Sequence, residues 1–408
     1  MPLARRKDDF MDNKVIYLDN NATTAVAPEV KEAMDPFLCE LYGNPSSIHA
    51  FGGQVAKYVD IARQQVAELL GCHPTEVLFT SCGTESDNAA IRSALPVNPH
   101  LKTIVTTRVE HPAVRNLCHT LERPGPIGFD NRVIELPVDS LGELSLPDIG
   151  NALDEDVAVV SIMWANNETG VIFPIENIAD MCRDRGILFH TDAVQAVGKI
   201  PIDLSNTAID MLSLSGHKLH APKGIGALFV RHGCRFQPFV VGGHQERNRR
   251  AGTESVPLIV ALGKACELAR QNLDRENTAV RALRDKLEKA LLASCPDAKL
   301  NGHPEHRLPN TSNISFEYIE GESILLMMDE YGICASSGSA CTTGSLEPSH
   351  VLRAMGIPYT AAHGSIRFSL SVYNTEAEID KVIEVLPPII QRLREISPFG
   401  REQKQAAT

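Results

Sequence analysis

Short apolar runs alternate with stretches of helical periodicity along most of the chain, and this alternation restricts the possible folds more than any other feature. The helical stretch VAKYVDIARQQVAELLG precedes the apolar run EVLFTS, and ESDNAAIRSAL precedes KTIVTT. The same order returns in VAVVSIMWA, IENIADMCRDRG and ILFHTDA. Continuous β-branched runs are typical of strands that are covered on both faces. The sequence therefore predicts an α/β fold with a mostly parallel sheet.

A long helical region from Val256 to Leu292 separates this pattern from a different one. The segments that follow, NISFEYI, ESILLMMDEYG, SIRFSLS and EIDKVIEVLPPIIQRLREI, mix strands and helices. We predict a large domain over residues 15–270 and a smaller α+β C-terminal domain over residues 271–399, which the N-terminal segment joins. Residues 1–14 are interpreted as an N-terminal extension and residues 400–408 as a disordered tail.

Composition excludes several classes of protein. The 408 residues, 43% of them hydrophobic, suffice for two cores. The net charge of -12, from 51 acidic and 39 basic residues, argues against binding to nucleic acid. Apolar runs stay shorter than the roughly 18 to 20 residues that span a bilayer, and the start, MPLARRKDDF, lacks the apolar segment of a signal peptide. We therefore expect a cytoplasmic protein without membrane or nucleic-acid partners.

The ten cysteines are scattered and form no C-x-x-C pair, so neither a disulfide framework nor a stable metal site is expected. Cys341 is unusual because it lies in ASSGSACTTGS, a run of small residues with low backbone stiffness. Such a run is either a linker that contains an inert cysteine or a flexible segment that holds a reactive thiol. The other motifs decide between these readings.

The residues directly after each apolar run carry the chemistry, because ligands of open α/β sheets bind at the carboxyl ends of the strands. EVLFTS is followed by Cys82, Gly83 and Thr84. Gly83 permits close approach of the backbone, and the T-x-x-D pattern that begins at Thr84 is a common helix cap. The functional alternative is a phosphate group at the helix N-terminus, bound by backbone N–H groups and the Thr84 hydroxyl.

Two further strand ends carry polar residues. Asp192 and Gln195 follow ILFHT, where a carboxylate can also merely cap a turn, and Ser215, His217 and Lys218 follow IDMLSL. A lysine at a buried strand end is destabilised unless its charge is removed, and reaction with an aldehyde to form an imine removes it. A surface lysine with a buried stem is the alternative. Phosphate cup, carboxylate and lysine together indicate pyridoxal phosphate as the cofactor.

The motifs also carry a family resemblance. They are YLDNNATT, YGNPSSIH, FTSCGTESDN, VEHPAV, ANNETG, FHTDAVQAVGK, LSGHKLHAPKGIGAL, RRAGTESV, SSGSACTTGSLEPSHVLRAMG and GSIRFSLS. In this order, from Val15 to Ile396, the chain resembles the pyridoxal-phosphate cysteine desulfurases of nitrogen fixation and iron–sulfur assembly. The resemblance implies a fold-type I transferase of class V, with a mostly parallel seven-stranded sheet in the large domain.

The resemblance implies roles for the residues around the cofactor ring. Lys218 would form the imine and move the Cα proton of the substrate. Asp192 would pair with the pyridinium nitrogen, Gln195 would bond the ring oxygen, and His111 of VEHPAV would stack on the ring as a third catalytic residue beside Lys218 and Cys341. Without the motif, a histidine before a proline is more often a solvated turn residue.

Phosphate and substrate sites follow from the same resemblance. Gly83, Thr84, Ser215 and His217 would hold the phosphate together with Thr253 of a second subunit, so that a homodimer is implied. Asn44, Asn167 and Arg367 would bind the substrate carboxylate, with Asn167 also next to the cofactor. The planar fork of Arg367 suits a carboxylate, although an arginine that faces solvent and a simple turn at ANNETG are the alternatives.

The resulting hypothesis is a cysteine desulfurase that converts L-cysteine to L-alanine, leaves a persulfide on Cys341 and donates its sulfur to an iron–sulfur scaffold or another acceptor protein. Cys341 would be at most a transient cluster ligand. A selenocysteine lyase or an aminotransferase of the same fold is the first alternative. A cysteine hydrolase that uses Cys341 with His350 or His363, and a non-catalytic cluster scaffold, are the others.

Overall fold

The computed structural model describes residues 15–125, 130–337 and 348–397. In these residues the main sheet has seven strands, and all neighbours are parallel except the two pairs that involve β8. The predicted seven-stranded, mostly parallel sheet is therefore confirmed. Its strands, in spatial order, are β2 (Val77–Thr80), β8 (Gly226–Val230), β7 (Met211–Ser215), β6 (Leu188–Asp192), β5 (Val157–Ser161), β3 (Thr103–Thr107) and β4 (Arg132–Leu136).

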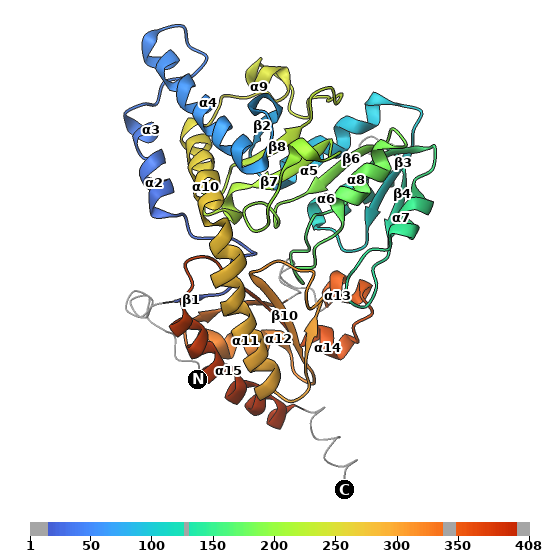
Figure 1. Ribbon diagram of the computed structural model, residues 1–408, viewed down its shortest axis with the longest axis vertical. Helices are drawn as coiled ribbons and strands as arrows, with labels where there is room; N and C mark the ends of the chain where they lie inside the picture. Colours follow the sequence, from blue (N-terminus) through green and yellow to red (C-terminus); the bar gives the residue numbers. More distant parts are fainter. Residues whose placement is uncertain (1–14, 126–129, 338–347, 398–408) are drawn as a thin grey trace.

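Helices connect these strands and pack on the sheet (Figure 1). Helix α5 packs against β6, β7 and β8, and helix α8 against β6. The helices of this part of the chain are α2 (Pro28–Met34), α3 (Pro36–Cys39), α4 (Ala50–Leu70), α5 (Gly83–Ala94), α6 (Pro112–Glu122), α7 (Leu146–Ala152), α8 (Ile175–Arg183), α9 (Gln245–Asn248) and α10 (Val256–Arg275). Short 3-10 turns occupy Pro74–Glu76, Leu95–Val97, Leu204–Asn206 and Gly216–Lys218.

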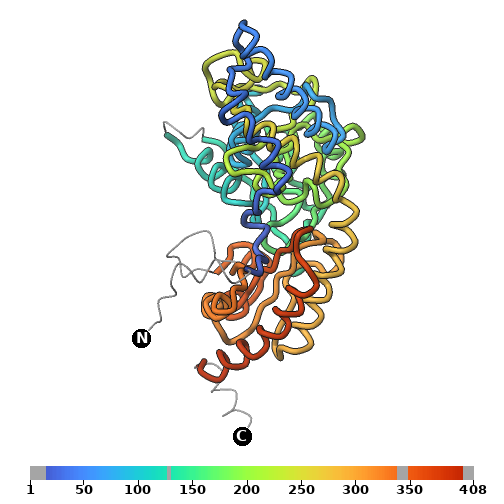
Figure 2. Tube along the Cα trace, turned by 90° about the vertical axis from the view of Figure 1, so that its left-hand side faces the viewer, coloured from blue at the N-terminus to red at the C-terminus, as the bar shows by residue number. Residues whose placement is uncertain are grey.

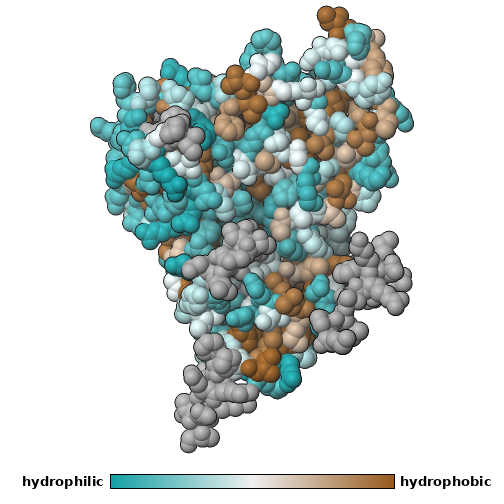
Figure 3. Space-filling model, turned by 180° about the vertical axis from the view of Figure 1, so that it is seen from behind, coloured by the Kyte–Doolittle hydropathy of each residue, from teal (hydrophilic) through white to brown (hydrophobic). Residues whose placement is uncertain are grey.

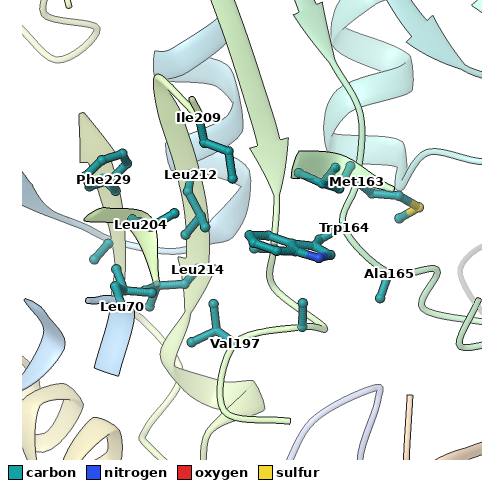
Figure 4. Packing of buried hydrophobic residues seen from close by; sticks show 14 of the residues in the cluster. Leu70, Met163, Trp164, Ala165, Val197, Leu204, Ile209, Leu212, Leu214 and Phe229 are labelled. Atoms are coloured by element: carbon teal, nitrogen blue, oxygen red, sulfur yellow. The ribbon is translucent and has the colours of Figure 1, made fainter. Parts of the chain in front are cut away.

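The strands β2, β3, β5, β7 and β8 of the main sheet are buried along their whole length, whereas the edge strand β4 is partly exposed. Figure 4 shows Trp164 close to Leu212 and Leu214 of β7 and to Val197, inside one continuous hydrophobic cluster. Helix α10 packs along α4 and α2 at the outside of this core. Burial on both faces explains why the apolar runs lack a strict alternation.

The C-terminal part forms a second layer, in the lower half of Figure 1. Its sheet has the order β12 (Ser336–Ser337), β13 (Ser365–Ser369), β10 (Thr311–Phe316) and β9 (Ala298–Asn301), and all its pairs are antiparallel. The strand β1 (Ile16–Tyr17) pairs with β11 (Ile333–Cys334). Its helices are α11 (Arg281–Ser294), α12 (Gly321–Asp329), α13 (His350–Ala354), α14 (Tyr359–His363) and α15 (Glu376–Ile396).

One long helical element links the two layers. It runs through α10, a π-helical turn at Glu276–Val280 and α11, and Figure 2 shows it as a continuous rod along the side of the molecule. The predicted helix from Val256 to Leu292 is thus confirmed, with a π turn that the sequence pattern did not indicate. The domain boundary near residue 270 stays a prediction. A separate hydrophobic cluster, which contains Leu18 of the N-terminal segment and residues from Val280 to Leu393, supports it.

Among the helices that the structure describes, none is both long and apolar enough to cross a membrane.

Candidate active site

A cavity of about 380 Å³ lies at the carboxyl end of the main sheet, where the two layers meet. Loops after β2, β5, β6 and β7 form one wall, and the N-terminal segment, β12 and β13 form the other. It contains most of the predicted site residues. The lining residues that were predicted are Gly83, Thr84, His111, Asn167, Asp192, Gln195, Ser215, His217, Lys218 and Arg367.

The N-terminus of α5 opens into this cavity. The N-cap position is Cys82 and not Thr84, so the interpretation of Thr84 as the helix cap is wrong. Because no described side chain caps this helix, its first N–H groups remain available to a ligand. Glycine is needed at position 83 for space, since a Cβ atom there would lie 2.9 Å from Cγ2 of Val194. Together with the exposed hydroxyl of Thr84, this end of α5 fits a phosphate group.

Ser215 and His217 extend the same anion site. The Ser215 Oγ atom is buried and has no hydrogen-bond partner within the described residues, so it can donate to a ligand. His217 Nδ1 lies 3.2 Å from Oγ1 of Thr23. Burial and the neighbouring Lys218 lower the pKa of His217 to about 4. At neutral pH this histidine is therefore uncharged and would act on a phosphate as a hydrogen-bond donor.

Asp192 lies at the end of β6, with 6% of its surface exposed. Its Oδ1 atom accepts a hydrogen bond of 2.9 Å from the backbone of Val194. Burial raises the pKa of Asp192, while His111 and Lys218 lower it. The surrounding groups compensate the negative charge of this buried carboxylate only in part. The carboxylate can therefore pair with a cationic N–H group of a ligand, such as a pyridinium nitrogen.

Gln195 and His111 lie beside Asp192. Nε2 of Gln195 donates to the backbone oxygen of Asn21 at 3.0 Å and retains a second hydrogen, while its Oε1 atom is buried without a partner among the described groups. His111 is the N-cap of α6, and its Nδ1 atom accepts the N–H of Ala113 at 3.2 Å. Burial lowers the pKa of His111, which keeps the ring neutral. A neutral ring suits stacking on an aromatic cofactor.

Lys218 ends the turn after β7. Its Nζ atom donates to the backbone oxygens of Asn21 at 2.5 Å and Ala22 at 2.7 Å. Burial, Arg367 and Lys199 lower the pKa of Lys218 from 10.5 to about 7. A substantial share of this amine is therefore neutral and nucleophilic at physiological pH.

Arg367 extends from the middle of β13 across the cavity from Lys218. Its guanidinium donates to Oδ1 of Asp19 at 2.7 Å and to the backbone oxygen of Asn167 at 3.0 Å. The Nε atom is buried and lacks a partner in the part of the chain that the structure describes. Arg367 is thus buried and oriented, so the alternative of a solvent-facing arginine is wrong.

Two predicted residues, Asn44 and Thr253, do not line this cavity. Asn44 lies in an exposed loop between α3 and α4, where Oδ1 accepts the N–H of Ser46. Thr253 is exposed and borders a different pocket, near Gly224. Cys341 lies outside the described residues. The position of Thr253 agrees with its predicted role in the site of a second subunit, whereas the sequence did not distinguish Asn44 from residues that line the cavity of their own chain.

Several cavity residues had no assigned role in the sequence analysis. Asn21 accepts hydrogen bonds from Lys218 and Gln195, and Asp19 orients Arg367. Both lie in LDNNATT, where a polar run follows the short apolar IYL, which was the available signal. Glu168 also lines the cavity, and burial raises its pKa to about 7.

A cluster of Glu143, His303 and His306 elsewhere brings three potential metal ligands together. However, Nδ1 of His303 accepts the backbone N–H groups of Glu305 at 3.0 Å and His306 at 2.8 Å. Its Nε2 atom therefore carries the proton and is not free to bind a cation. We interpret the cluster as a hydrogen-bonded link between the 139–143 turn and the 303–306 loop.

The comparisons with known proteins agree with this geometry. The family model of aminotransferase class-V matches residues 16–382. Cysteine desulfurase 2 of Trichormus variabilis is 61% identical over 389 residues, which are 95% of this chain and 96% of the relative. Cysteine desulfurase NifS of Azotobacter vinelandii is 61% identical over 385 residues, 94% of each chain. The chain belongs to the cysteine desulfurases of the class-V aminotransferase family.

A solved structure confirms the fold of this cysteine desulfurase family member. A NifS-like protein with 38% sequence identity superposes with a TM-score of 0.86 and covers 93% of this chain and 100% of its own. The chain is therefore a fold-type I enzyme that depends on pyridoxal phosphate. The chemistry of the uncapped end of α5, of the Ser215 hydroxyl and of the buried Asp192 carboxylate fits this cofactor.

Proposed function

We propose that this enzyme converts L-cysteine to L-alanine and stores the sulfur as a persulfide on Cys341, from which an acceptor protein of iron–sulfur assembly takes it. The main support is that Lys218, Arg367 and Asp192 line one cavity, to which they come from the turn after β7, from β13 and from β6. This arrangement can bind an amino acid by its carboxylate while a neutral amine is available for proton transfer.

The cofactor would be held at three points. The N-terminus of α5, Thr84, Ser215 and His217 would bind its phosphate, and Asp192 would keep its nitrogen protonated. When bound, pyridoxal phosphate supplies an electron sink that makes the substrate Cα proton acidic. The neutral ring of His111 would limit the position of the cofactor on one face.

Lys218 would take the substrate Cα proton on Nζ and return it later. The two backbone oxygens that accept from Nζ, those of Asn21 and Ala22, orient the amine toward the cavity. A pKa near 7 suits a group that must both accept and donate a proton at physiological pH.

Arg367 would bind the substrate carboxylate. Its fork is fixed by Asp19 and by the backbone of Asn167, and the buried Nε atom still lacks an acceptor among the described residues. A carboxylate oxygen would satisfy that donor in a charge-assisted hydrogen bond. Asn167 lies next to it and would contact the same substrate.

Sulfur transfer would use the Cys341 thiolate. It would attack the sulfur of cysteine, so that an S–S bond forms and the Cβ–S bond breaks. The electron pair of the broken bond stays on Cβ, and in the net reaction the proton of the substrate thiol ends there, which gives alanine. Cys341 follows Ser337, a cavity residue, by four positions, and four residues of chain span at most roughly 14 Å.

A second copy of the chain would complete the site. Thr253 and Asn44 are both exposed and away from the cavity of their own chain, as residues that act in a partner's site must be. Large apolar side chains are exposed near Asn44, with Tyr42 at 70% and Ile48 at 104% of full exposure. Figure 3, which shows the molecule from behind, has hydrophobic residues gathered in its upper right part. We propose that this surface contributes to a homodimer interface.

The alternatives receive less support. A cysteine hydrolase would need His350 or His363 at Cys341, but His350 Nε2 is bonded to the backbone oxygen of Glu110 and neither histidine lines the cavity. A selenocysteine lyase would use the same residues, but selenium would be removed from the substrate in place of sulfur. The cytoplasmic location, the lack of nucleic-acid and membrane partners, and the identity of the acceptor protein stay predictions from the sequence.

Mass spectrometry tests the proposal. The holoenzyme is incubated with L-cysteine without a reductant, and the expected result is one added sulfur on the peptide that contains Cys341. The C341A variant should bind cysteine, as the absorbance change of the cofactor reports, but should carry no added sulfur. Sulfur on another peptide, or release of alanine by C341A at the wild-type rate, would refute the assignment of Cys341.

A further inference from the structure

Glu168 connects the substrate cavity to the segment that carries Cys341. Its carboxyl group lies in the cavity wall, and only 7% of its surface is exposed. Oε2 accepts a hydrogen bond from the Ser349 hydroxyl, across 181 positions of the chain. The proposed reaction gives no role to either residue.

Ser349 is the N-cap of α13. Its Oγ atom accepts the N–H groups of Val351 at 3.1 Å and Leu352 at 3.2 Å, while its hydroxyl hydrogen is donated to Glu168. It is 4% exposed. The side chain of Ser349 thus fixes the start of α13 and ties that start to the cavity wall.

The other end of the same segment is also fixed at the cavity. Ser336 and Ser337 form β12, which pairs with Arg367 and Ile366 of β13. Ser336 and Ser337 both line the cavity. The residues between Ser337 and Ser349, which include Cys341, are therefore connected at both ends to groups that form the substrate site.

The backbone around Glu168 is held without the contact to Ser349. The N–H of Glu168 donates to Asn166 Oδ1 at 2.9 Å, and its carbonyl oxygen accepts from Asn313 Nδ2 at 3.1 Å. Burying a carboxyl group is unfavourable, and burial raises the pKa of Glu168 while the Ser349 hydroxyl and Arg367 lower it. The side chain of Glu168 is therefore buried for its contacts with other segments, among them the start of α13 at Ser349.

We propose that Glu168 is a positioning residue for sulfur transfer, which acts through Ser349 to hold the start of α13, eight positions after Cys341, at the wall of the substrate cavity. This inference rests on the proposed function. Glu168 would not contact the reacting atoms. Its loss would leave the binding of cysteine intact and slow the step in which sulfur reaches Cys341.

Single-turnover kinetics of the holoenzyme separate these two steps. The absorbance change of the cofactor follows cysteine binding, and quenched samples analysed by mass follow sulfur on Cys341. The variants are E168A, S349A, the double variant and E168Q, whose amide oxygen can still accept the serine hydroxyl. The control is S145A, which removes the serine N-cap of α7 at a site remote from the cavity.

We expect E168A and S349A to slow persulfide formation about tenfold, the order of effect of losing one buried hydrogen bond. Cysteine binding should change less than twofold by comparison. The double variant should be no slower than the slower single variant, because both remove one interaction. E168Q should recover most of the rate, and S145A should match wild type. Hydrogen exchange of residues 348–354 should be faster in E168A than in wild type. A variant that only lost a contact with the substrate in the cavity would not show this faster exchange.

Two failures are distinguishable. If wild type forms no persulfide on Cys341, the proposed function is wrong and this role of Glu168 falls with it. If wild type forms the persulfide and E168A does so at the same rate, or if E168A weakens cysteine binding as much as it slows sulfur transfer, only the role of Glu168 is refuted.

Discussion

The pKa of Lys218 is the property on which the proposed chemistry depends most directly, and it can be measured without turnover. Burial lowers this pKa from 10.5 to about 7, with further lowering by Arg367 and Lys199. A shift of roughly 3.5 units corresponds to about 5 kcal/mol of destabilisation of the ammonium form relative to the neutral amine. The cofactor-free enzyme should therefore contain a lysine that reacts as a free amine near neutral pH.

Competitive acylation of the cofactor-free protein, with peptides quantified by mass spectrometry, gives the fraction of neutral amine at each pH. Lys218 should become reactive with a midpoint near pH 7. Lys299 is the internal control, because its hydrogen bond of 2.7 Å to Glu317 raises its pKa. In R367Q the midpoint of Lys218 should move to higher pH, since a nearby positive charge is removed.

The reasoning would be refuted by a Lys218 midpoint above pH 9, close to that of Lys299. An unchanged midpoint in R367Q would refute the contribution of Arg367 and leave burial as the cause. Rapid reconstitution with pyridoxal phosphate at pH 7.5, but not at pH 5.5, would follow from the same midpoint, because only the neutral amine attacks the aldehyde.

Three more predictions concern other contacts. R367K should weaken cysteine binding about 10- to 100-fold, because a lysine cannot reproduce the two parallel hydrogen bonds of the guanidinium group. Titration with cysteine, followed by the absorbance of the cofactor, measures the affinity, and an unchanged affinity would contradict the carboxylate site. E246A should lower the free energy of unfolding by about 3 to 5 kcal/mol, because Arg63 would stay buried without the carboxylate that it contacts at 2.7 Å. Denaturant unfolding measures this loss, and a loss below 1 kcal/mol would contradict the prediction. Burial lowers the pKa of His190 to about 3, so the folded state takes up its proton later than the unfolded state as pH falls. The free energy of unfolding should therefore decrease by up to about 5 kcal/mol from pH 6.5 toward pH 3, and H190N should reduce this slope.

The strand-end residues of the large domain were predictable because their chemistry is local. A parallel sheet places the carboxyl ends of its strands at one edge, so Thr84, Asp192 and Lys218 were expected to meet once the strands were recognised. The side chains that complete the site come from distant segments. Asp19 reaches Arg367 across 348 positions, and Ser349 reaches Glu168 across 181. Periodicity carries no information about such pairs.

The sequence by itself determined the class of fold, the chemistry of the cofactor site and the family. Apolar runs, glycine and a lysine at a strand end are each restricted by local physics, namely burial, backbone approach and the cost of a buried charge. Only the tertiary structure decided that α5 begins without a capping side chain, that Lys218 lies against the backbone of Asn21, and that Asn44 lies away from the cavity of its own chain. These features depend on how the two layers pack, because burial and the partners of a polar atom are set by residues that are remote in the chain.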